Sequence, residues 1–182
     1  SSANGFKIKL IARSINKDGK IEALVEPLLL GEDHMLAKVD SVFNGVLVKG
    51  SYTGDSMFYG KGAGKLPTAS AILGDIIEIL TGSSEHSLPG FVKEKAEMTT
   101  SKQDSFRFFV RLWKNSISTE EMEKIVVNSF GKVAIYCGES EVNRKKAALI
   151  TGYLSREELD KKIEELTKSL NIKVENVIKV ED

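Results

Sequence analysis

The stretch that decides the fold lies in the second half of the chain and reads Ser118-Thr119-Glu120-Glu121-Met122-Glu123-Lys124-Ile125-Val126-Val127-Asn128-Ser129-Phe130. Its first four residues form a capping box. In this motif the Ser118 hydroxyl accepts a hydrogen bond from a first-turn N–H, and the Glu121 carboxylate accepts one from the N–H of Ser118. Apolar residues then recur at helical spacing, at Met122, Ile125, Val126 and Phe130. The stretch therefore predicts a helix with one apolar face.

The same signature returns at Ser155-Arg156-Glu157-Glu158, followed by the apolar residues Leu159, Ile163, Leu166 and Leu170. Around the two helices lie four strand candidates, at residues 106–113, 133–137, 147–153 and 174–180. The order β-α-β-β-α-β is the split βαβ, or ferredoxin-like, motif. We expect an antiparallel sheet there, with both helices on one face.

The first half of the chain is richer in glycine, with eleven of the 15 glycines in residues 1–82. Residues 6–11 and 21–30 read as a strand and its returning partner around a turn at 16–19, and Pro27 implies an edge, a bulge or a strand end. Residues 46–48 and 57–59 are short buried-strand candidates. Asn44-Gly45 fits either a hairpin turn or the point where a helical turn at 37–43 becomes a strand. Residues 83–104 lack sustained periodicity and read as a linker or a long loop.

One segment carries the features of a ligand-binding corner: Phe58-Tyr59-Gly60-Lys61-Gly62-Ala63-Gly64-Lys65-Leu66-Pro67-Thr68-Ala69-Ser70. Three alternate glycines follow a strand end, and proline opens the helix that comes next. Backbone without Cβ atoms and the unpaired N–H groups of a helix start suit a carboxamide, carboxylate or phosphate. The alternative is a tight strand-to-helix turn. The spacing fits neither the P-loop nor the G-x-G-x-x-G fingerprint.

The helix that follows is apolar on nearly all sides from Ala69 to Leu80, relieved chiefly by Asp75 and Glu78. Such a helix is expected to be covered all round. Either an oligomer buries it, or part of the protein is absent from this chain.

These residues resemble homoserine dehydrogenase. The resemblance is carried by Gly5-x-x-Ile8-Lys9-Leu10-Ile11-Ala12, Val25-x-Pro27-x-Leu29, His34-x-Leu36-Ala37-x-Val39 with Asn44-x-Val46, and Phe58-Tyr59-Gly60-x-Gly62-Ala63-Gly64-x-x-Pro67-Thr68-Ala69 with Gly74-Asp75. The match runs almost continuously over residues 5–82. The βαββαβ half is similar to the ACT regulatory domain that many of these enzymes carry at the C-terminus.

The resemblance implies an α/β (α+β) fold: a mixed sheet with a buried return helix, followed by a ferredoxin-like, ACT-like domain. It divides the chain into the end of the catalytic and dimerisation domain at 1–82, a linker at 83–104 and the ACT-like domain at 105–182. The Rossmann domain and the catalytic residues would then precede residue 1, so we assign no catalytic residue here. In the full-length enzyme the cofactor would be NAD or NADP. Gly62, Ala63, Gly64 and Thr68 would face its nicotinamide end.

The implied reaction is the reversible oxidation of L-homoserine to L-aspartate 4-semialdehyde, on the way to threonine, methionine and isoleucine. The isolated chain is expected to be inactive. The competing interpretation is a free-standing module that senses small molecules or mediates assembly without catalysis. The loop at 114–119 lacks the Asp-x-x-Gly by which ACT domains commonly bind amino acids. We therefore expect this module to dimerise or merely to pack.

Other chemically distinctive residues have structural interpretations. We expect a capping or sheet-rim role for His34, and a buried, small apolar role for Cys137. We interpret Lys7, Lys9, Glu22 and Glu26 as solvent-face or structural charges.

Composition limits the remaining classes. Lys+Arg and Asp+Glu both number 26 in 182 residues, and this neutral balance argues against nucleic-acid binding. One cysteine and two distant histidines make a metal site improbable. No apolar run reaches membrane length and no signal peptide is seen. We expect a cytoplasmic homodimer or higher homo-oligomer acting on a small molecule.

Overall fold

The computed structural model describes residues 5–82, 94–100, 104–113, 117–131, 133–137, 146–170 and 172–181. The chain packs into two compact units. The first combines Ser1–Gly31 with Glu97–Asp182, and the second is Glu32–Ala96. None of the helices within the described ranges has the length and apolar character needed to cross a lipid bilayer.

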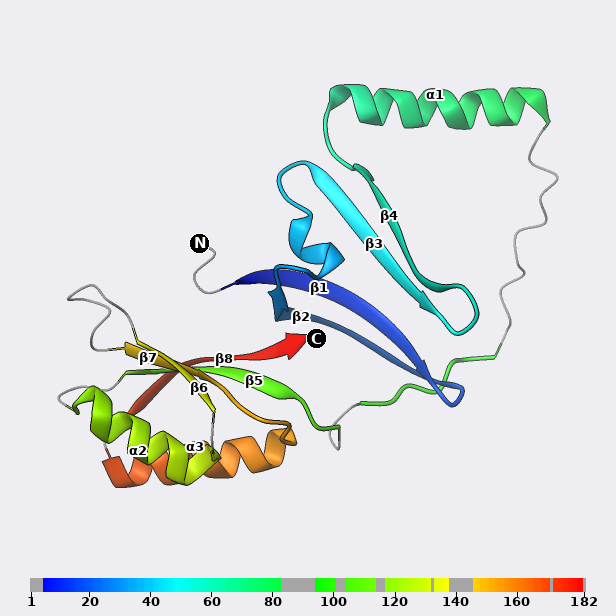
Figure 1. Ribbon diagram of the computed structural model, residues 1–182. Coiled ribbons are helices and arrows are strands. Elements are labelled where there is room, and N and C mark those ends of the chain that lie inside the picture. Colours follow the sequence, from blue (N-terminus) through cyan, green and yellow to red (C-terminus); the bar gives the residue numbers. More distant parts are fainter. Residues whose placement is uncertain are drawn as a thin grey trace. The chain divides into compact units, whose positions relative to one another are not determined.

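The first unit is built on a mixed six-stranded sheet (Figure 1). Its strands are β1 (Phe6–Lys17), β2 (Lys20–Gly31), β5 (Arg107–Trp113), β6 (Ala134–Cys137), β7 (Lys146–Ile150) and β8 (Lys173–Glu181), in the spatial order β1-β2-β8-β5-β7-β6. The pairing of β2 with β8 is parallel, and the other pairings are antiparallel. Strands β8-β5-β7-β6 form the sheet of the predicted βαββαβ motif, which is confirmed.

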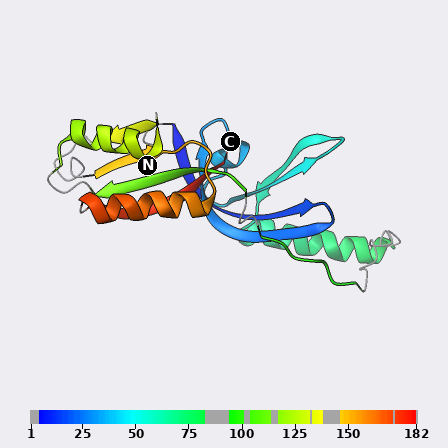
Figure 2. The ribbon, with the colours of Figure 1, turned by 90° about the horizontal axis from the view of Figure 1, so that it is seen from below.

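Two helices cover one face of this part of the sheet, α2 (Thr119–Phe130) and α3 (Arg156–Leu170), as Figures 1 and 2 show. Both predicted capping boxes are present. The N–H of Glu121 donates to Ser118 Oγ at 3.2 Å, and the N–H of Ser155 donates to Glu158 Oε2 at 2.8 Å. The core between helices and sheet consists of Phe108, Val110, Leu112, Met122, Val126, Ala147, Leu149, Leu159 and Ile172.

The β1–β2 hairpin turns at Asp18 and Gly19, which both have positive φ, of 52° and 85°. Pro27 lies inside β2, where β1 is the strand's partner and pairing with β8 has not yet begun. This is the edge situation that its missing N–H requires.

The two glutamates of the hairpin, Glu22 and Glu26, are structural charges. Glu22 is buried and lies 3.0 Å from Lys17 Nζ, while Glu26 pairs with Arg13. Hydrogen bonds from Lys17 to Asp104 and, second, to Glu22 raise its pKa above the usual value. Lys7 and Lys9 are half-buried, and the apolar alternates of β1, Ile8 and Leu10, are exposed.

The two compact units divide the chain at other residues than the predicted domains 1–82 and 105–182 do. The domain division itself stays a prediction. Residues Leu28–Leu30 pair with Lys179–Glu181, so the hairpin from the start of the chain extends the sheet of the second half. No local sequence pattern signals this parallel pairing, because its two strands are about 150 residues apart.

The second unit contains the short helix η1 (Met35–Lys38), the antiparallel pair β3 (Phe43–Gly50) and β4 (Gly54–Lys61), and the helix α1 (Lys65–Thr81). Asn44-Gly45 lies within β3, so it is not a hairpin turn, and the helical turn before the strand lies at Met35–Lys38 instead of 37–43. Val46, Val48, Phe58 and Tyr59 are exposed, so the expectation that these strands are buried is wrong for the described chain. The return helix α1 was expected to be buried, but none of its residues is buried within the described chain.

Candidate functional site

The candidate site is the corner between β4 and α1. Strand β4 ends at Lys61, and the next residue is anchored by a hydrogen bond from the N–H of Gly62 to the carbonyl oxygen of Val42, at 3.2 Å. Gly64 then adopts φ 119° and ψ 154° and becomes the N-cap of α1. That positive φ favours glycine, since a side chain there is strained. The chain thus turns from strand to helix within three residues.

The helix starts with unpaired donors. Gly64 provides no side-chain cap, and the first turn of α1 contains no acidic residue. The N–H of Thr68 already donates to the carbonyl oxygen of Gly64, at 3.1 Å. The preceding N–H groups of the first turn carry the positive end of the helix dipole. Of the two Thr68 groups considered from the sequence, the hydroxyl remains available at this end.

The three glycines of the corner differ in their surroundings. A Cβ atom on Gly60 would have no neighbour within 4 Å, so the backbone there is open to a ligand. A Cβ atom on Gly62 would lie 1.5 Å from Nδ2 of Asn44. The open space that the alternating glycines suggested therefore exists at Gly60, whereas the Asn44 side chain already occupies it at Gly62.

The β3–β4 pair also has packing contacts on the face that carries Phe43, Gly45 and Tyr59. The rings of Phe43 and Tyr59 stack with centroids 4.8 Å apart and planes within 7°. A Cβ atom on Gly45 would come within 3.3 Å of Val39, Met57 and Leu36, so η1 packs closely against this face. His34 caps η1, since its Nδ1 accepts a hydrogen bond from the N–H of Leu36 at 3.2 Å. The predicted capping role of His34 is confirmed.

The helix behind the corner presents its apolar residues to the outside. Leu66, Ile72, Leu73, Ile76, Ile77, Ile79 and Leu80 are between 46% and 83% exposed. Isolated exposed apolar side chains are ordinary, but a contiguous set of this kind marks a surface that another element covers. Nothing within the described chain provides that cover.

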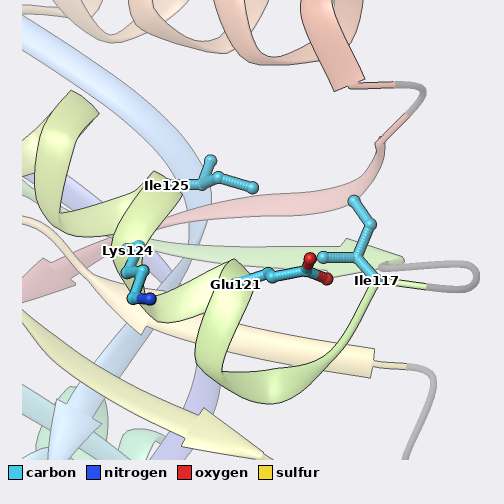
Figure 3. A pocket seen from close by; sticks show the side chains of 4 residues that line it. All are labelled: Ile117, Glu121, Lys124 and Ile125. Carbon is cyan, nitrogen blue, oxygen red and sulfur yellow. The ribbon is translucent and has the colours of Figure 1, made fainter.

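A second concavity lies in the βαββαβ half, beside the start of α2. It has a volume of about 330 Å³ and is lined by Ile117, Glu121, Lys124 and Ile125 (Figure 3). The Glu121 carboxylate accepts hydrogen bonds from the N–H and the hydroxyl of Ser118, so it is committed to the capping box. Residues 114–116 of the predicted effector loop lie outside the described residues, as does the side chain of Cys137.

The sequence-predicted site residues Gly62, Ala63, Gly64 and Thr68 all lie at the β4–α1 corner, and their role in binding a cofactor stays a prediction. Asn44 was missed as a site residue. Its signal is the strand register, which sets Asn44 opposite Gly60, and it cannot be read before the partner of β4 is known. In the described ranges, no three His, Cys, Asp or Glu residues group as metal ligands.

Comparisons with known proteins find relatives of the first half. The family model for homoserine dehydrogenase matches residues 1–77. The homoserine dehydrogenase of Synechocystis sp. is 46% identical over 89 residues, covering 45% of this chain and 21% of the relative. That of Corynebacterium glutamicum is 49% identical over 78 residues, covering 40% and 18%.

The likeness to solved structures extends over both halves. A crystal structure of S. aureus homoserine dehydrogenase superposes with a TM-score of 0.65 and 32% identity, covering 98% of this chain and 42% of that one. The homoserine dehydrogenase of Thiobacillus denitrificans, at 24% identity and a TM-score of 0.66, shows the same fold. The chain spans about two fifths of the length of these structures. Residues 1–77 are therefore similar to the homoserine dehydrogenase family, and the chain spans only part of the length of the relatives that it matches.

Proposed function

We propose that this chain is part of an NAD(P)-dependent homoserine dehydrogenase, which interconverts L-homoserine and L-aspartate 4-semialdehyde in the pathway to threonine, methionine and isoleucine. The observation that carries the proposal is the β4–α1 corner within the matched residues. It combines open backbone at Gly60, a positive φ at Gly64 and an uncapped helix start. We place the enzyme in the cytoplasm, as a homodimer or higher homo-oligomer.

The residues of the corner fit the nicotinamide end of the cofactor. A carboxamide needs donors for its oxygen, and the first-turn N–H groups of α1 supply them without competition from a capping side chain. Gly62, Ala63 and Gly64 form the wall, and the Thr68 hydroxyl adds a group that can donate or accept. When bound, the nicotinamide ring supplies hydride transfer.

The task of the corner is to hold the ring in place. Hydride transfer requires the reacting atoms to be held about 3–3.5 Å apart, and a rigid wall contributes by fixing one of the partners. We assign no catalytic residue to this chain. The groups that bind homoserine and move its proton would come from the remainder of the protein, so the chain alone is inactive.

The test compares the full-length protein that carries this chain with residues 1–182 alone. The full-length protein should reduce NAD or NADP in the presence of L-homoserine, and the absorbance of the reduced nicotinamide reports the rate. Residues 1–182 alone should show no such rate. Homoserine oxidation by the isolated chain, or its absence from the folded full-length protein, would contradict the proposal.

A module that senses small molecules without catalysis is the second candidate. It is favoured by the cavity at Ile117, Lys124 and Ile125 on the βαββαβ half. Isothermal titration of the full-length protein with single amino acids, repeated with Lys124→Ala, separates the two functions. Sensing without catalysis requires binding that depends on Lys124 in a protein that does not oxidise homoserine.

A further inference from the structure

Asn44 occupies a position at the corner that the glycine pattern did not reveal. It is the second residue of β3 and pairs with Gly60 across the β3–β4 ladder. An ideal Cβ on Gly62 would lie 1.5 Å from Asn44 Nδ2 and 2.7 Å from its Cγ. Contacts this short do not occur between real atoms. The Asn44 carboxamide therefore lies in the space that any side chain at position 62 would need.

The orientation of that carboxamide leaves one atom open. From the same Cβ position, Oδ1 of Asn44 is 3.4 Å away, farther than Nδ2 and Cγ. The nitrogen is thus the amide atom nearest to position 62, and the oxygen is the atom farthest from it. Among the described residues the Asn44 side chain has no hydrogen-bond partner. Its neighbour across the ladder, Gly60, has open space where a side chain would stand.

A ligand carboxamide needs this kind of acceptor. A primary carboxamide carries one oxygen acceptor and two N–H donors, and burying it without partners for both costs binding free energy. The backbone N–H groups at the start of α1 can satisfy only the oxygen. The amide oxygen of Asn44, which lies farther from position 62 than the amide nitrogen does, can supply the missing acceptor for the NH₂ group.

We propose that Asn44 recognises the carboxamide of the nicotinamide ring, with Oδ1 accepting a hydrogen bond from its NH₂ group, and that residue 62 is glycine because a side chain there would displace Asn44. The inference rests on the proposed function and deepens it. It makes Asn44 a specificity-determining residue, and it assigns Gly62 the role of leaving room for Asn44.

The experiment measures equilibrium binding of the cofactor to the full-length protein by isothermal titration. Two ligands are compared: the natural cofactor, NAD or NADP, and its 3-acetylpyridine analogue, which keeps the carbonyl oxygen but has a methyl group in place of the NH₂. The variants are Asn44→Ala, Gly62→Ala and the double variant. Asn128→Ala removes an exposed asparagine from α2 and serves as the matched control.

Asn44→Ala should weaken binding of the natural cofactor about threefold to tenfold, the range of one neutral hydrogen bond, and should leave binding of the analogue nearly unchanged. Gly62→Ala should likewise weaken binding of the natural cofactor and leave binding of the analogue nearly unchanged. The double variant should bind the natural cofactor no more weakly than either single variant does. Asn128→Ala should match the wild type with both ligands.

Four results would decide against the proposal. Equal weakening of both ligands by Asn44→Ala would show a purely structural role. A loss in Gly62→Ala that persists undiminished when Asn44 is already alanine would show that the glycine serves the ligand directly. Unchanged binding in Asn44→Ala, in a wild-type protein that binds the cofactor and oxidises homoserine, would refute the role of Asn44 alone. A folded wild-type protein that binds neither NAD nor NADP would refute the proposed function as well.

Discussion

The Nζ atom of Lys179, near the end of β8, lies 3.1 Å from Oε1 of Glu26 in β2. Glu26 also lies 3.1 Å from Arg13, whose second nitrogen reaches Glu181 at 3.1 Å. The Arg13 guanidinium and the Lys179 ammonium both lie over the ring of Phe106, at 5.9 and 4.5 Å. These charges connect the hairpin to the last strand at the short parallel junction.

Glu26 is the centre of this network, and we expect Glu26→Gln to destabilise the first unit by about 2 kcal/mol. The side chains of Arg13, Glu26, Lys179 and Glu181 are between 14% and 29% exposed, so removing one carboxylate leaves partly buried cations underpaired. Urea unfolding followed by the fluorescence of Trp113 in β5 measures the change, since this single tryptophan belongs to the same unit.

Asp160→Asn is the matched control. Its partner Arg156 lies one helical turn away on the surface, and such exposed pairs contribute about 0.3 kcal/mol. Equal effects of the two substitutions would show that the junction network is no stronger than a surface ion pair.

Two adjacent valines on α2 test where the core lies. Val126 is fully buried, whereas Val127 is 46% exposed. Val126→Ala should cost about 2 kcal/mol, because it removes two methyl groups from a closely packed site, and Val127→Ala should cost less than about 0.5 kcal/mol. The same urea experiment compares them, and a larger loss at Val127 would mean that α2 is rotated from the position described.

The second half of the fold was predictable from the sequence because its signals are local. Ser118 and Glu121, and likewise Ser155 and Glu158, are three residues apart, and each apolar face follows within the same helix. Local spacing and tertiary packing agree there, so helices, strands and their order could all be deduced.

The remainder depends on partners that are distant along the chain. The pairing of Leu28–Leu30 with Lys179–Glu181 and the proximity of Asn44 to Gly62 follow from register and packing, which no short motif encodes. The site could be located from the alternating glycines, but the role of each glycine could not. Gly60 is open, Gly62 accommodates Asn44, and Gly64 provides the positive φ.

The capping box of α3 predicts a specific loss of stability in acid. The N–H of Ser155 and, second, its hydroxyl donate to the Glu158 carboxylate and lower its pKa below the usual value of 4.5. The unfolded chain therefore binds this proton at a higher pH than the folded chain does. The contribution of Glu158 is complete above pH 4.5 and is lost as the pH falls through the lowered pKa.

Glu158→Gln keeps an acceptor in the box but cannot titrate. The free energy of unfolding of the wild type should therefore fall more steeply than that of Glu158→Gln as the pH drops below 4.5, the usual pKa of the group. Glu157→Gln, which removes a neighbouring carboxylate outside the box, should follow the wild type. Parallel curves for the wild type and Glu158→Gln would contradict the assignment.

A double substitution on the exposed helix α1 should affect the folded stability of the isolated chain and of the full-length protein differently. Ile77→Lys combined with Leu80→Lys should reduce self-association of the isolated chain at least about tenfold, because each apolar side chain withdrawn from an interface costs more than about 1.4 kcal/mol. The folded stability of the isolated chain should hardly change, since both residues are exposed in it. Sedimentation velocity and urea unfolding measure the two quantities.

In the full-length protein the same double variant should be destabilising, because we propose that the rest of the enzyme covers α1 there. Glu78→Lys is the control, since it changes the net charge by the same two units without removing an apolar side chain. A full-length protein that tolerates both lysines as well as it tolerates Glu78→Lys would show that α1 has no covering partner. A double variant that associates like the wild type in the isolated chain would show that this apolar surface does not drive its self-association.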